Sequence, residues 1–425
     1  MSDVKTIRPI PEFFGKWEVP ADKSVVQRAL MLASVAEGES FIRARDLGED
    51  CLTTKNCMRA LGVDIRRAND GIFVVGTKKF ADGKTLDCGN SATCMRLLTG
   101  LLAGRGTHAV LTGDNSLCAR PMRRVIEPLK SLGAEISSKD GCAPLTVLPR
   151  VLQGGEVPLN ISSAQVKSAV LMAGLFAKGK TCVVETVPTR DHTERLISYM
   201  GGRLSKNGNA ICVEQSSLFS REIDVAGDIS SAAYLLALGV LKGSATVKEV
   251  GVNPGRIGFL SVLERMGVKV ERRNERTLSG EPRADIFIRQ APLRAVNIGG
   301  EEVPSLIDEL PLIAILSAFA DGDSVLTGAS ELRVKECDRI RATCALIRAL
   351  GGRAEEYADG WKIFGGSLVG GKVKADVICG DHRMALTAAL GLLASEQGGE
   401  LQGGEIASVS FPNFFKKLQT MGVCI

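Results

Sequence analysis

Six segments of the chain share one pattern of hydrophobic and polar positions. Each begins with small polar residues, continues as a run rich in alanine and leucine, and ends near a glycine that precedes an apolar strand segment. The runs are apolar on nearly every side, which predicts buried helices. Their starts lie 67 to 76 residues apart. The six runs begin at Ser24, Ser91, Ser163, Ser230, Ser305 and Asp381.

A second, amphipathic helical pattern alternates with the first. It ends in Leu-Gly or Met-Gly, and glycine just after a helix is a common stop signal. The segment that follows alternates in polarity, as at 268–272, which predicts a strand with one face in solvent. The chain thus contains six repeats of two helices and several strands, which could form one ring or two lobes of three. The terminating glycines are Gly62, Gly133, Gly201, Gly267, Gly351 and Gly422.

The beginnings of the buried helices are candidate anion sites. A helix start presents free N–H groups and a partial positive charge. Several starts also carry a lysine or arginine, as at 22–24 and 380–383. Ordinary capping is the alternative for any single start. If the starts converge, they predict a site for strongly anionic ligands.

Length and composition restrict the function classes. A chain of 425 residues predicts two or three domains. A net charge of +5 and an aromatic content of 4% favour neither nucleic acid nor a membrane as partner. The apolar run 310–320 is about half of the ~20 residues that a membrane span needs. The first residues have no signal or transit character, so we expect a cytoplasmic protein.

Cysteine and histidine do not suggest a metal centre. The twelve cysteines form no CxxC pair and no cluster of zinc spacing, so we expect reduced thiols and no metal site. With only three histidines, the chemistry must rest on lysine, arginine, aspartate and glutamate. Such a residue set suits proton transfer near phosphates without a cofactor.

Four charged motifs are candidates for that chemistry. Lys23 and Ser24 open the first buried helix, and Arg28 follows one turn later. Arg120 precedes a proline that we expect to start the next helix. Asp308 begins an otherwise apolar helix, where a carboxylate could act as a base. Each could instead serve as a helix cap or a surface ion pair.

The fourth motif, 333–339, packs five charges into seven residues. Lys335 and Arg339 are four residues apart, which predicts one helix face that could hold a phosphate or carboxylate, with Glu336 as an acid. A salt-bridged surface helix is the alternative.

Taken together, the motifs resemble those of the 5-enolpyruvylshikimate-3-phosphate synthase family over essentially the whole chain. Each alone is weak, but all occur in order and in register with the six repeats. The matching segments are 22–28, 89–96, 112–114 with 120–122, 163–165, 190–194, 227–231, 306–309, 332–339, 381–384 and 410–412.

The resemblance implies the fold and its division. It implies an α/β (α+β) enolpyruvyl transferase fold with two lobes of three βαβαββ-type repeats, with buried parallel helices and sheets outside. One lobe would comprise residues 1–20 and 229–425, with phosphoenolpyruvate contacts and catalytic carboxylates. The other, 21–228, would carry most shikimate 3-phosphate contacts. The crossovers are expected near Pro20 and Asp228, with the active site in the cleft between the lobes.

The same resemblance implies the site residues. Asp308, Glu336 and Lys23 would be catalytic. The expected shikimate 3-phosphate contacts are Lys23, Ser24, Arg28, Ser163, Gln165, Arg190, Asp308 and Lys335. The expected phosphoenolpyruvate contacts are Lys23, Ala92, Arg120, Gln165, Arg339 and Arg383.

The implied activity is transfer of an enolpyruvyl group from phosphoenolpyruvate to the 5-hydroxyl of shikimate 3-phosphate by addition and elimination. We expect a monomer without cofactor. Ala92 stands where many relatives have glycine, which resembles the glyphosate-tolerant class. Two alternatives are a UDP-N-acetylglucosamine enolpyruvyl transferase, whose cysteine position is Asn115 here, and a non-catalytic anion-binding protein of the same fold.

Overall fold

The structure is a computed structural model that describes residues 4–420 and 422. The chain divides into two compact units. We call Ala21–Ala226 with Thr277–Pro282 the N-terminal unit. Met1–Pro20, Gly227–Arg276 and Arg283–Ile425 form the C-terminal unit. Each unit has its own hydrophobic core.

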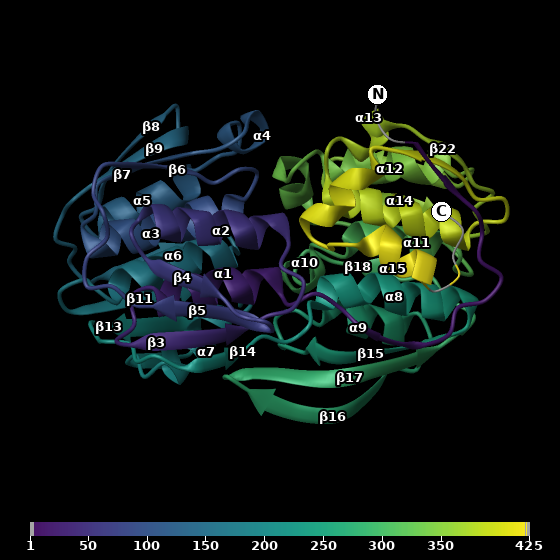
Figure 1. Cartoon of the computed structure of the whole chain (residues 1–425). Coiled ribbons are helices and arrows are strands. Elements are labelled where there is room, and N and C mark those ends of the chain that lie inside the picture. The colour runs from purple at the N-terminus through teal and green to yellow at the C-terminus, as the bar shows by residue number, and fades with distance from the viewer. Residues whose placement is uncertain (1–3, 421, 423–425) are drawn as a thin grey trace. The chain divides into compact units, whose positions relative to one another are not determined.

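The N-terminal unit contains three four-stranded sheets with one common order (Figure 1). Each has one parallel pair followed by antiparallel strands. The sheets are, in spatial order, β14 (Glu222–Asp224), β3 (Glu39–Arg43), β5 (Gly71–Val75) and β4 (Asp64–Arg67); β6 (Lys84–Asp87), β7 (Ala109–Thr112), β9 (Cys142–Leu148) and β8 (Glu135–Lys139); and β10 (Glu156–Leu159), β11 (Lys180–Glu185), β13 (Ala210–Glu214) and β12 (Leu204–Asn207).

Three nearly all-buried helices fill the core of this unit. A Cβ atom at Gly100 would lie 2.2 Å from the carbonyl oxygen of Ala169, so glycine permits the close packing of α3 on α6. The buried helices are α1 (Lys23–Ala33), α3 (Ala92–Arg105) and α6 (Ala164–Gly174). The second helix type comprises α2 (Glu49–Ala60), α5 (Arg123–Ser131) and α7 (His192–Tyr199), and α4 (Asn115–Cys118) is a short extra turn.

The C-terminal unit repeats this plan with two four-stranded sheets and one three-stranded sheet. The N-terminal strands β1 and β2 pair with β23 and β15, which come from much later in the chain. The sheets are β16 (Glu271–Leu278), β17 (Glu281–Arg289), β15 (Ser244–Gly251) and β2 (Lys16–Glu18); β18 (Asn297–Ile298), β19 (Ser324–Leu326), β21 (Gly360–Phe364) and β20 (Arg353–Tyr357); and β1 (Val4–Ile7), β23 (Gly399–Gln402) and β22 (Gly371–Val373).

Buried helices again form the centre of this unit. The sequence of α11 is apolar except for Ser317, and all its residues are buried. The buried helices are α8 (Ile229–Lys242), α11 (Leu310–Ala318) and α14 (His382–Ala394), and the short α10 (Val303–Leu306) is half-buried. The others are α9 (Gly258–Arg265), α12 (Arg339–Ala349), α13 (Ala375–Ile378), α15 (Phe414–Thr420), and the 3-10 turns η1 (Ser330–Val334) and η2 (Gly404–Val409).

The glycine stops are confirmed, because all six predicted glycines have left-handed φ angles of +81° to +96°. Three local predictions are wrong. The fifth buried helix is broken into α10 and α11 by a turn at 307–309. Lys335 follows η1 and therefore shares no helix face with Arg339, which opens α12. Pro121 lies outside α5, which begins at Arg123 after Met122.

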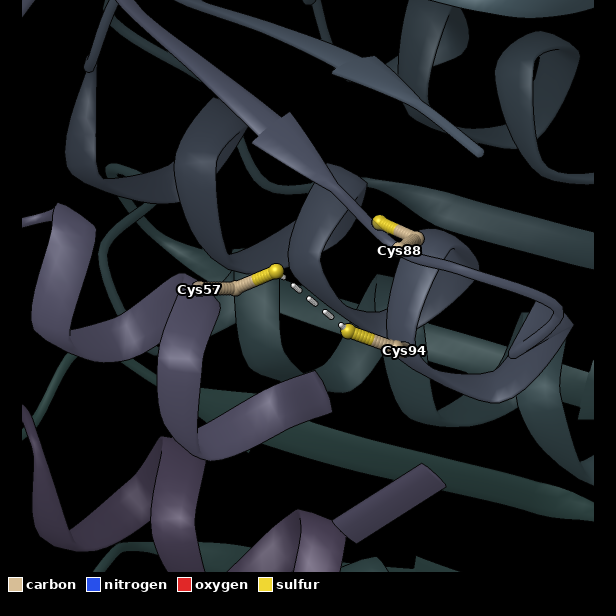
Figure 2. A group of neighbouring side chains, drawn as sticks. All are labelled: Cys57, Cys88 and Cys94. Atoms are coloured by element: carbon tan, nitrogen blue, oxygen red, sulfur yellow. Dashed lines mark hydrogen bonds between the residues drawn. The ribbon is translucent and has the colours of Figure 1, made fainter. Parts of the chain in front are cut away.

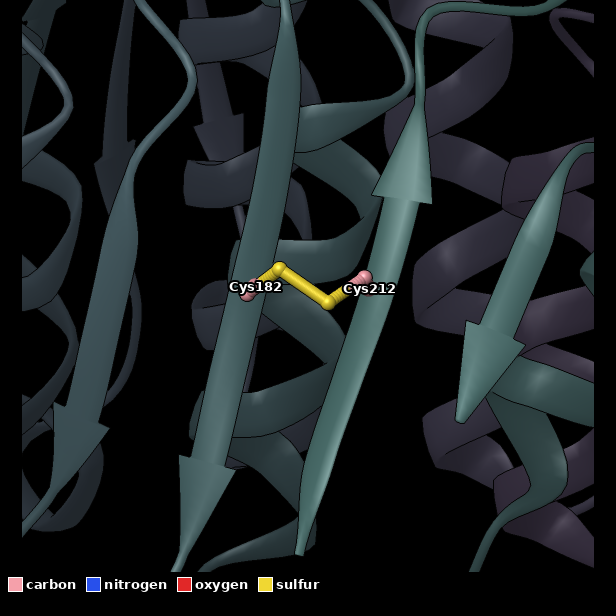
Figure 3. Close-up of a disulfide and its surroundings, with 2 residues drawn as sticks. All are labelled: Cys182 and Cys212. Atoms are coloured by element: carbon pink, nitrogen blue, oxygen red, sulfur yellow. A yellow bond between two sulfur atoms is a disulfide. The ribbon is translucent and has the colours of Figure 1, made fainter. Parts of the chain in front are cut away.

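The expectation that every cysteine is a reduced thiol is also wrong. Cys182 and Cys212 form a disulfide (Figure 3). They are directly opposite each other on the antiparallel strands β11 and β13, with Cα atoms 4.0 Å apart. Such close cross-strand pairs bring two side chains together on one face. The two cysteines are 30 residues apart, so their spacing gives no sign of this pairing.

None of the described helices has both the length and the apolar character that a membrane crossing requires.

Candidate active-site residues and family

The N-terminal unit places Lys23, Ser24 and Arg28 on the first two turns of α1. Asp22 caps this helix by accepting a hydrogen bond from the N–H of Val25 at 3.0 Å. Lys23 Nζ pairs with Asp50 Oδ2 at 2.8 Å, and both side chains are mostly buried. The ammonium group is thereby held at the positive end of a helix, where an anion would be favoured.

Arg28 is almost fully buried and is held by neutral groups. It donates to Thr193 Oγ1 and Ser168 Oγ, each at 2.8 Å, and to the carbonyl of Ser24 at 2.9 Å. Burial and, to a smaller extent, the nearby Arg190 lower the pKa of Arg28 to about 10. The guanidinium still carries its charge at neutral pH, so Arg28 adds positive potential to the start of α1 while it connects α1 to α6 and α7.

Gln165 joins the beginnings of α6 and α3. Its Oε1 accepts a hydrogen bond from Arg96 Nη1 at 2.6 Å, and its Nε2 donates to Thr93 Oγ1 at 2.8 Å. Ser163 caps α6 by accepting from the N–H of Val166. Ala92 is the first residue of α3 and is 8% exposed. These contacts fix the relative position of two helix starts.

Arg120 lies in the loop before α5 and is held near α3. Its Nη2 donates to Asn90 Oδ1 at 2.7 Å and to Ser116 Oγ at 3.4 Å. Asn90 in turn donates to Asp114 Oδ2 at 2.7 Å. Arg96 also donates to the carbonyl of Pro121 at 3.3 Å. The loop that carries Arg120 is therefore tied to the segment that precedes Ala92.

A buried lysine supports the loop that carries Arg190. Lys167 Nζ is 3.0 Å from Glu185 Oε2, 2.6 Å from Glu194 Oε1 and 3.1 Å from the carbonyl of Thr189. Burial raises the pKa of the Glu194 carboxyl, and Lys167 opposes that rise. No role for Lys167 was predicted from the sequence. Its three contacts assign it to positioning this loop.

The C-terminal unit surrounds Asp308 with three arginines. Asp308 Oδ1 is 3.3 Å from Arg383 Nε and 3.5 Å from Arg339 Nη1. Its Oδ2 is 3.4 Å from Arg256 Nη1. Arg256 also donates to Ser230 Oγ at 2.6 Å. The sequence predictions named Asp308, Arg339 and Arg383, and missed Arg256 as a partner.

Arg339 is the centre of a second set of ion pairs in this unit. Its Nε is 2.7 Å from Asp381 Oδ2, and its Nη2 is 2.6 Å from Glu336 Oε2. Burial lowers the pKa of Arg339, but Asp381 and Glu336 outweigh this and raise it. Burial raises the pKa of the Asp381 carboxyl, but the attraction of Arg339 is stronger, so this pKa lies below its ordinary value. Both groups are therefore charged at neutral pH.

Lys335 and Arg383 complete the predicted residues of the C-terminal unit. Lys335 Nζ is 3.5 Å from Glu331 Oε1. Partial burial lowers the pKa of Lys335, and Glu331 opposes this. Arg383 is the second residue of α14, whose cap Asp381 accepts the N–H of Arg383 at 2.8 Å.

The predicted residues thus fall into two sets. The N-terminal set is Lys23, Ser24, Arg28, Ala92, Arg120, Ser163, Gln165 and Arg190, and the C-terminal set is Asp308, Lys335, Glu336, Arg339 and Arg383. Each set is gathered around helix beginnings of its own unit. Their supporting partners Asp50, Lys167, Arg256 and Asp381 were missed, because contacts between distant segments leave no local pattern.

Comparisons with known proteins agree with the motifs. Residues 7–418 match the family described as EPSP synthase (3-phosphoshikimate 1-carboxyvinyltransferase). A 3-phosphoshikimate 1-carboxyvinyltransferase of Desulfitobacterium hafniense is 43% identical over 420 residues, 96% of each chain. One of Acidithiobacillus ferrooxidans is 42% identical over 426 residues, 99% of this chain and 98% of the other.

Solved structures confirm the predicted fold class. An EPSP synthase structure from Acinetobacter baumannii has a TM-score of 0.86 and 36% identity, covering 99% of this chain and 98% of the other. The enolpyruvyl transferase NikO of Streptomyces tendae, at 16% identity and a TM-score of 0.80, covers 100% of this chain and 98% of that one, and shares the fold. By sequence and by structure, this chain belongs to the EPSP synthase family.

Proposed function

We propose that this protein transfers the enolpyruvyl group of phosphoenolpyruvate to the 5-hydroxyl of shikimate 3-phosphate and releases phosphate. The family match over residues 7–418 and the names of relatives at 42–43% identity support the reaction. The observation that carries the chemistry is the C-terminal set, where Asp308 and Glu336 are each paired with buried arginine. It supplies proton-transfer groups beside fixed cations.

The proposed steps assign one proton to each carboxylate. The 5-hydroxyl oxygen attacks C2 of phosphoenolpyruvate while Asp308 accepts the hydroxyl proton and Glu336 donates a proton to C3. Glu336 then removes a proton from C3 as the bond from C2 to the phosphate oxygen breaks, and the hydroxyl proton held by Asp308 passes to the released phosphate. Lys23 assists by stabilising charge on the phosphate. No oxidant or cofactor is needed, because the addition and elimination balance.

The proposed binding roles are those that the family resemblance implies. We propose that Lys23, Ser24, Arg28, Ser163, Gln165, Arg190, Asp308 and Lys335 contact shikimate 3-phosphate. Lys23, Ala92, Arg120, Gln165, Arg339 and Arg383 would contact phosphoenolpyruvate. Arg339 supports this, because its buried Nη1 makes no hydrogen bond among the residues described and has only the 3.5 Å ion pair with Asp308 Oδ1. A carboxylate or phosphate oxygen would supply one.

The decisive assay measures phosphate release with shikimate 3-phosphate and phosphoenolpyruvate together. Glu336→Gln should lower kcat by about 10²- to 10⁴-fold, because general acid–base catalysis typically contributes that much. Glu405→Gln, at an exposed position of η2, is the matched control and should keep wild-type activity. An unchanged kcat in Glu336→Gln would remove its proton role. No release by the wild type would end the proposal.

The same assay separates the alternatives. Phosphate release with UDP-N-acetylglucosamine in place of shikimate 3-phosphate would identify the sister reaction. Substrate binding without release in either mixture would identify a non-catalytic anion-binding protein. The names of the relatives favour neither alternative.

We also propose that the enzyme is weakly inhibited by glyphosate. Ala92 opens α3, so its methyl group extends from the helix start proposed to bind phosphoenolpyruvate. Ala92→Gly should lower the inhibitory concentration of glyphosate at least about tenfold, about 1.4 kcal/mol, because a close steric contact is removed. Inhibition assays on both forms measure this. Potent inhibition of the wild type would contradict the proposal.

A cytosolic monomer completes the proposed description. The mild net charge of +5 favours neither nucleic acid nor a membrane as a partner. Light scattering of the purified chain at two concentrations tests the monomer, which a mass near 90 kDa rather than 45.1 kDa would contradict, since a dimer doubles the chain mass.

A further inference from the structure

Three cysteines from separate segments of the N-terminal unit meet in its core. Cys57 is on α2, Cys88 follows β6, and Cys94 is on the first turn of α3 (Figure 2). All three sulfur atoms lie within 4.8 Å of one another, and Cys57 Sγ is 4.0 Å from Cys94 Sγ. The side chains are 3%, 0% and 0% exposed. This cluster takes no part in the proposed reaction.

The spacing of the sulfur atoms fits a three-coordinate ion. A bond of about 2.3 Å to each sulfur, at angles near 100° around a pyramidal three-coordinate atom, places the sulfurs about 3.5 Å apart. The sulfur-to-sulfur distances, all within 4.8 Å, therefore need to shorten by less than about 1.5 Å for the triangle to close around one such atom. Among the residues described, no histidine or carboxylate joins the group. A tetrahedral zinc site would require such a fourth ligand.

Charge decides which ion suits this place. Three thiolates carry three negative charges, so a site with a monovalent ion keeps two negative charges and a site with a divalent ion keeps one. An uncompensated charge in a buried site costs several kcal/mol. A trivalent ion leaves none. We propose that Cys57, Cys88 and Cys94 form a binding site for a trivalent thiophilic metalloid, for which arsenite is the probe.

The binding step balances without oxidation or reduction. Arsenous acid, As(OH)₃, reacts with three thiols to form three As–S bonds and three molecules of water. The three thiol protons leave in that water, and arsenic remains trivalent. The product is neutral, as a dry site requires.

Binding would also affect the start of α3. Cys88 and Cys94 flank Ser91, whose Oγ caps α3 and accepts from Gln27 Nε2 at 3.0 Å. Closing the sulfur triangle pulls this segment toward α2, and with it Ala92 and Thr93. Because the thiols are buried, arsenite reaches them only through local opening, so binding is slow. Any loss of activity that follows rests on the proposed function, whereas binding itself does not.

Intact-mass measurement of the reduced chain after incubation with arsenite is the test. We expect one arsenic per chain at this site, with a mass gain of one arsenic less three hydrogens. The gain should disappear in Cys57→Ala and in Cys88→Ala. Cys142→Ala, at a half-buried position outside the cluster, should keep it. A pair of thiols, such as reduced Cys182 and Cys212, gives an adduct heavier by one water, so the mass distinguishes the two sites.

A thermal measurement keeps the test independent of any one variant. With the Cys182–Cys212 disulfide left intact, arsenite should raise the Tm of the wild type and of Cys142→Ala, and should leave that of Cys88→Ala unchanged, because a ligand stabilises only the state that binds it. Absence of the three-thiol adduct in the wild type, or its persistence in both cluster variants, would overturn the proposal. An adduct that is present while the enzyme remains inactive with its proposed substrates would leave this site supported and the function refuted.

Discussion

Arg28 and Arg339 are equally buried, at 1% exposure, yet their surroundings differ in kind. In the N-terminal unit, Arg28 donates to two hydroxyls and a backbone carbonyl. In the C-terminal unit, Arg339 is paired with the carboxylates of Asp381 and Glu336. Neutral partners leave the charge of Arg28 uncancelled at short range, whereas Arg339 belongs to a balanced ionic group.

The difference suggests that the N-terminal residues mainly bind anions and the C-terminal residues mainly transfer protons. Uncancelled positive charge beside helix starts favours binding of an anion such as the phosphate of shikimate 3-phosphate. Carboxylates that are held by arginines supply groups that accept and return protons at fixed positions. The N-terminal unit also buries carboxylates, but Glu185 and Glu194 hold Lys167 behind the loop that carries Arg190.

The largest expected effect comes from removing Arg339. Arg339→Met leaves Asp381 buried and unpaired, and breaking such a pair typically costs about 3–5 kcal/mol of unfolding free energy. Urea unfolding measures this loss, and phosphate release should fall with it. A loss below about 1 kcal/mol would show that Asp381 does not depend on this arginine.

The matched change in the other unit should cost less. Arg28→Met leaves Ser168 and Thr193, which already hydrogen-bond to each other at 2.7 Å. We expect a loss of about 1–3 kcal/mol in the same urea experiment, because no charge is left unpaired. KM for shikimate 3-phosphate should rise more than kcat falls. Equal stability losses in the two variants would break the comparison between the units.

The smallest expected effect is a dependence of the free energy of unfolding on pH in the acid range. Asp381 has a folded-state pKa below its ordinary value of 3.8, so the folded chain binds fewer protons than the unfolded chain. The stabilisation is fully present above pH 3.8 and is lost as pH falls through the depressed folded-state pKa. In urea unfolding from about pH 6 to about pH 3, Asp381→Asn should therefore show a smaller decline than the wild type.

Asp376→Asn, at an exposed position on α13, is the control for this experiment and should decline as steeply as the wild type. A wild type and an Asp381→Asn variant with parallel declines would show that the Arg339 pair does not set the acid stability.

Much of the fold could be predicted because the information is local. A buried helix needs only a run of apolar residues with a capping group, as at Ser91 and Ser163, which cap α3 and α6. A helix stop needs one glycine with a left-handed φ, as at Gly62. The break at 307–309 does have a local signal that the prediction did not use, because Asp308 and Glu309 interrupt the apolar residues and Pro311 stands in the first turn of α11.

The sequence by itself determined the six repeats, the glycine stops of the helices and the family, because each depends on residues that are close along the chain. Only the tertiary structure decided which distant groups meet. It paired Arg339 with Asp381, joined Cys182 to Cys212, and brought Cys57 to Cys88 and Cys94. Such contacts depend on strand register and helix packing, which no spacing within the sequence records.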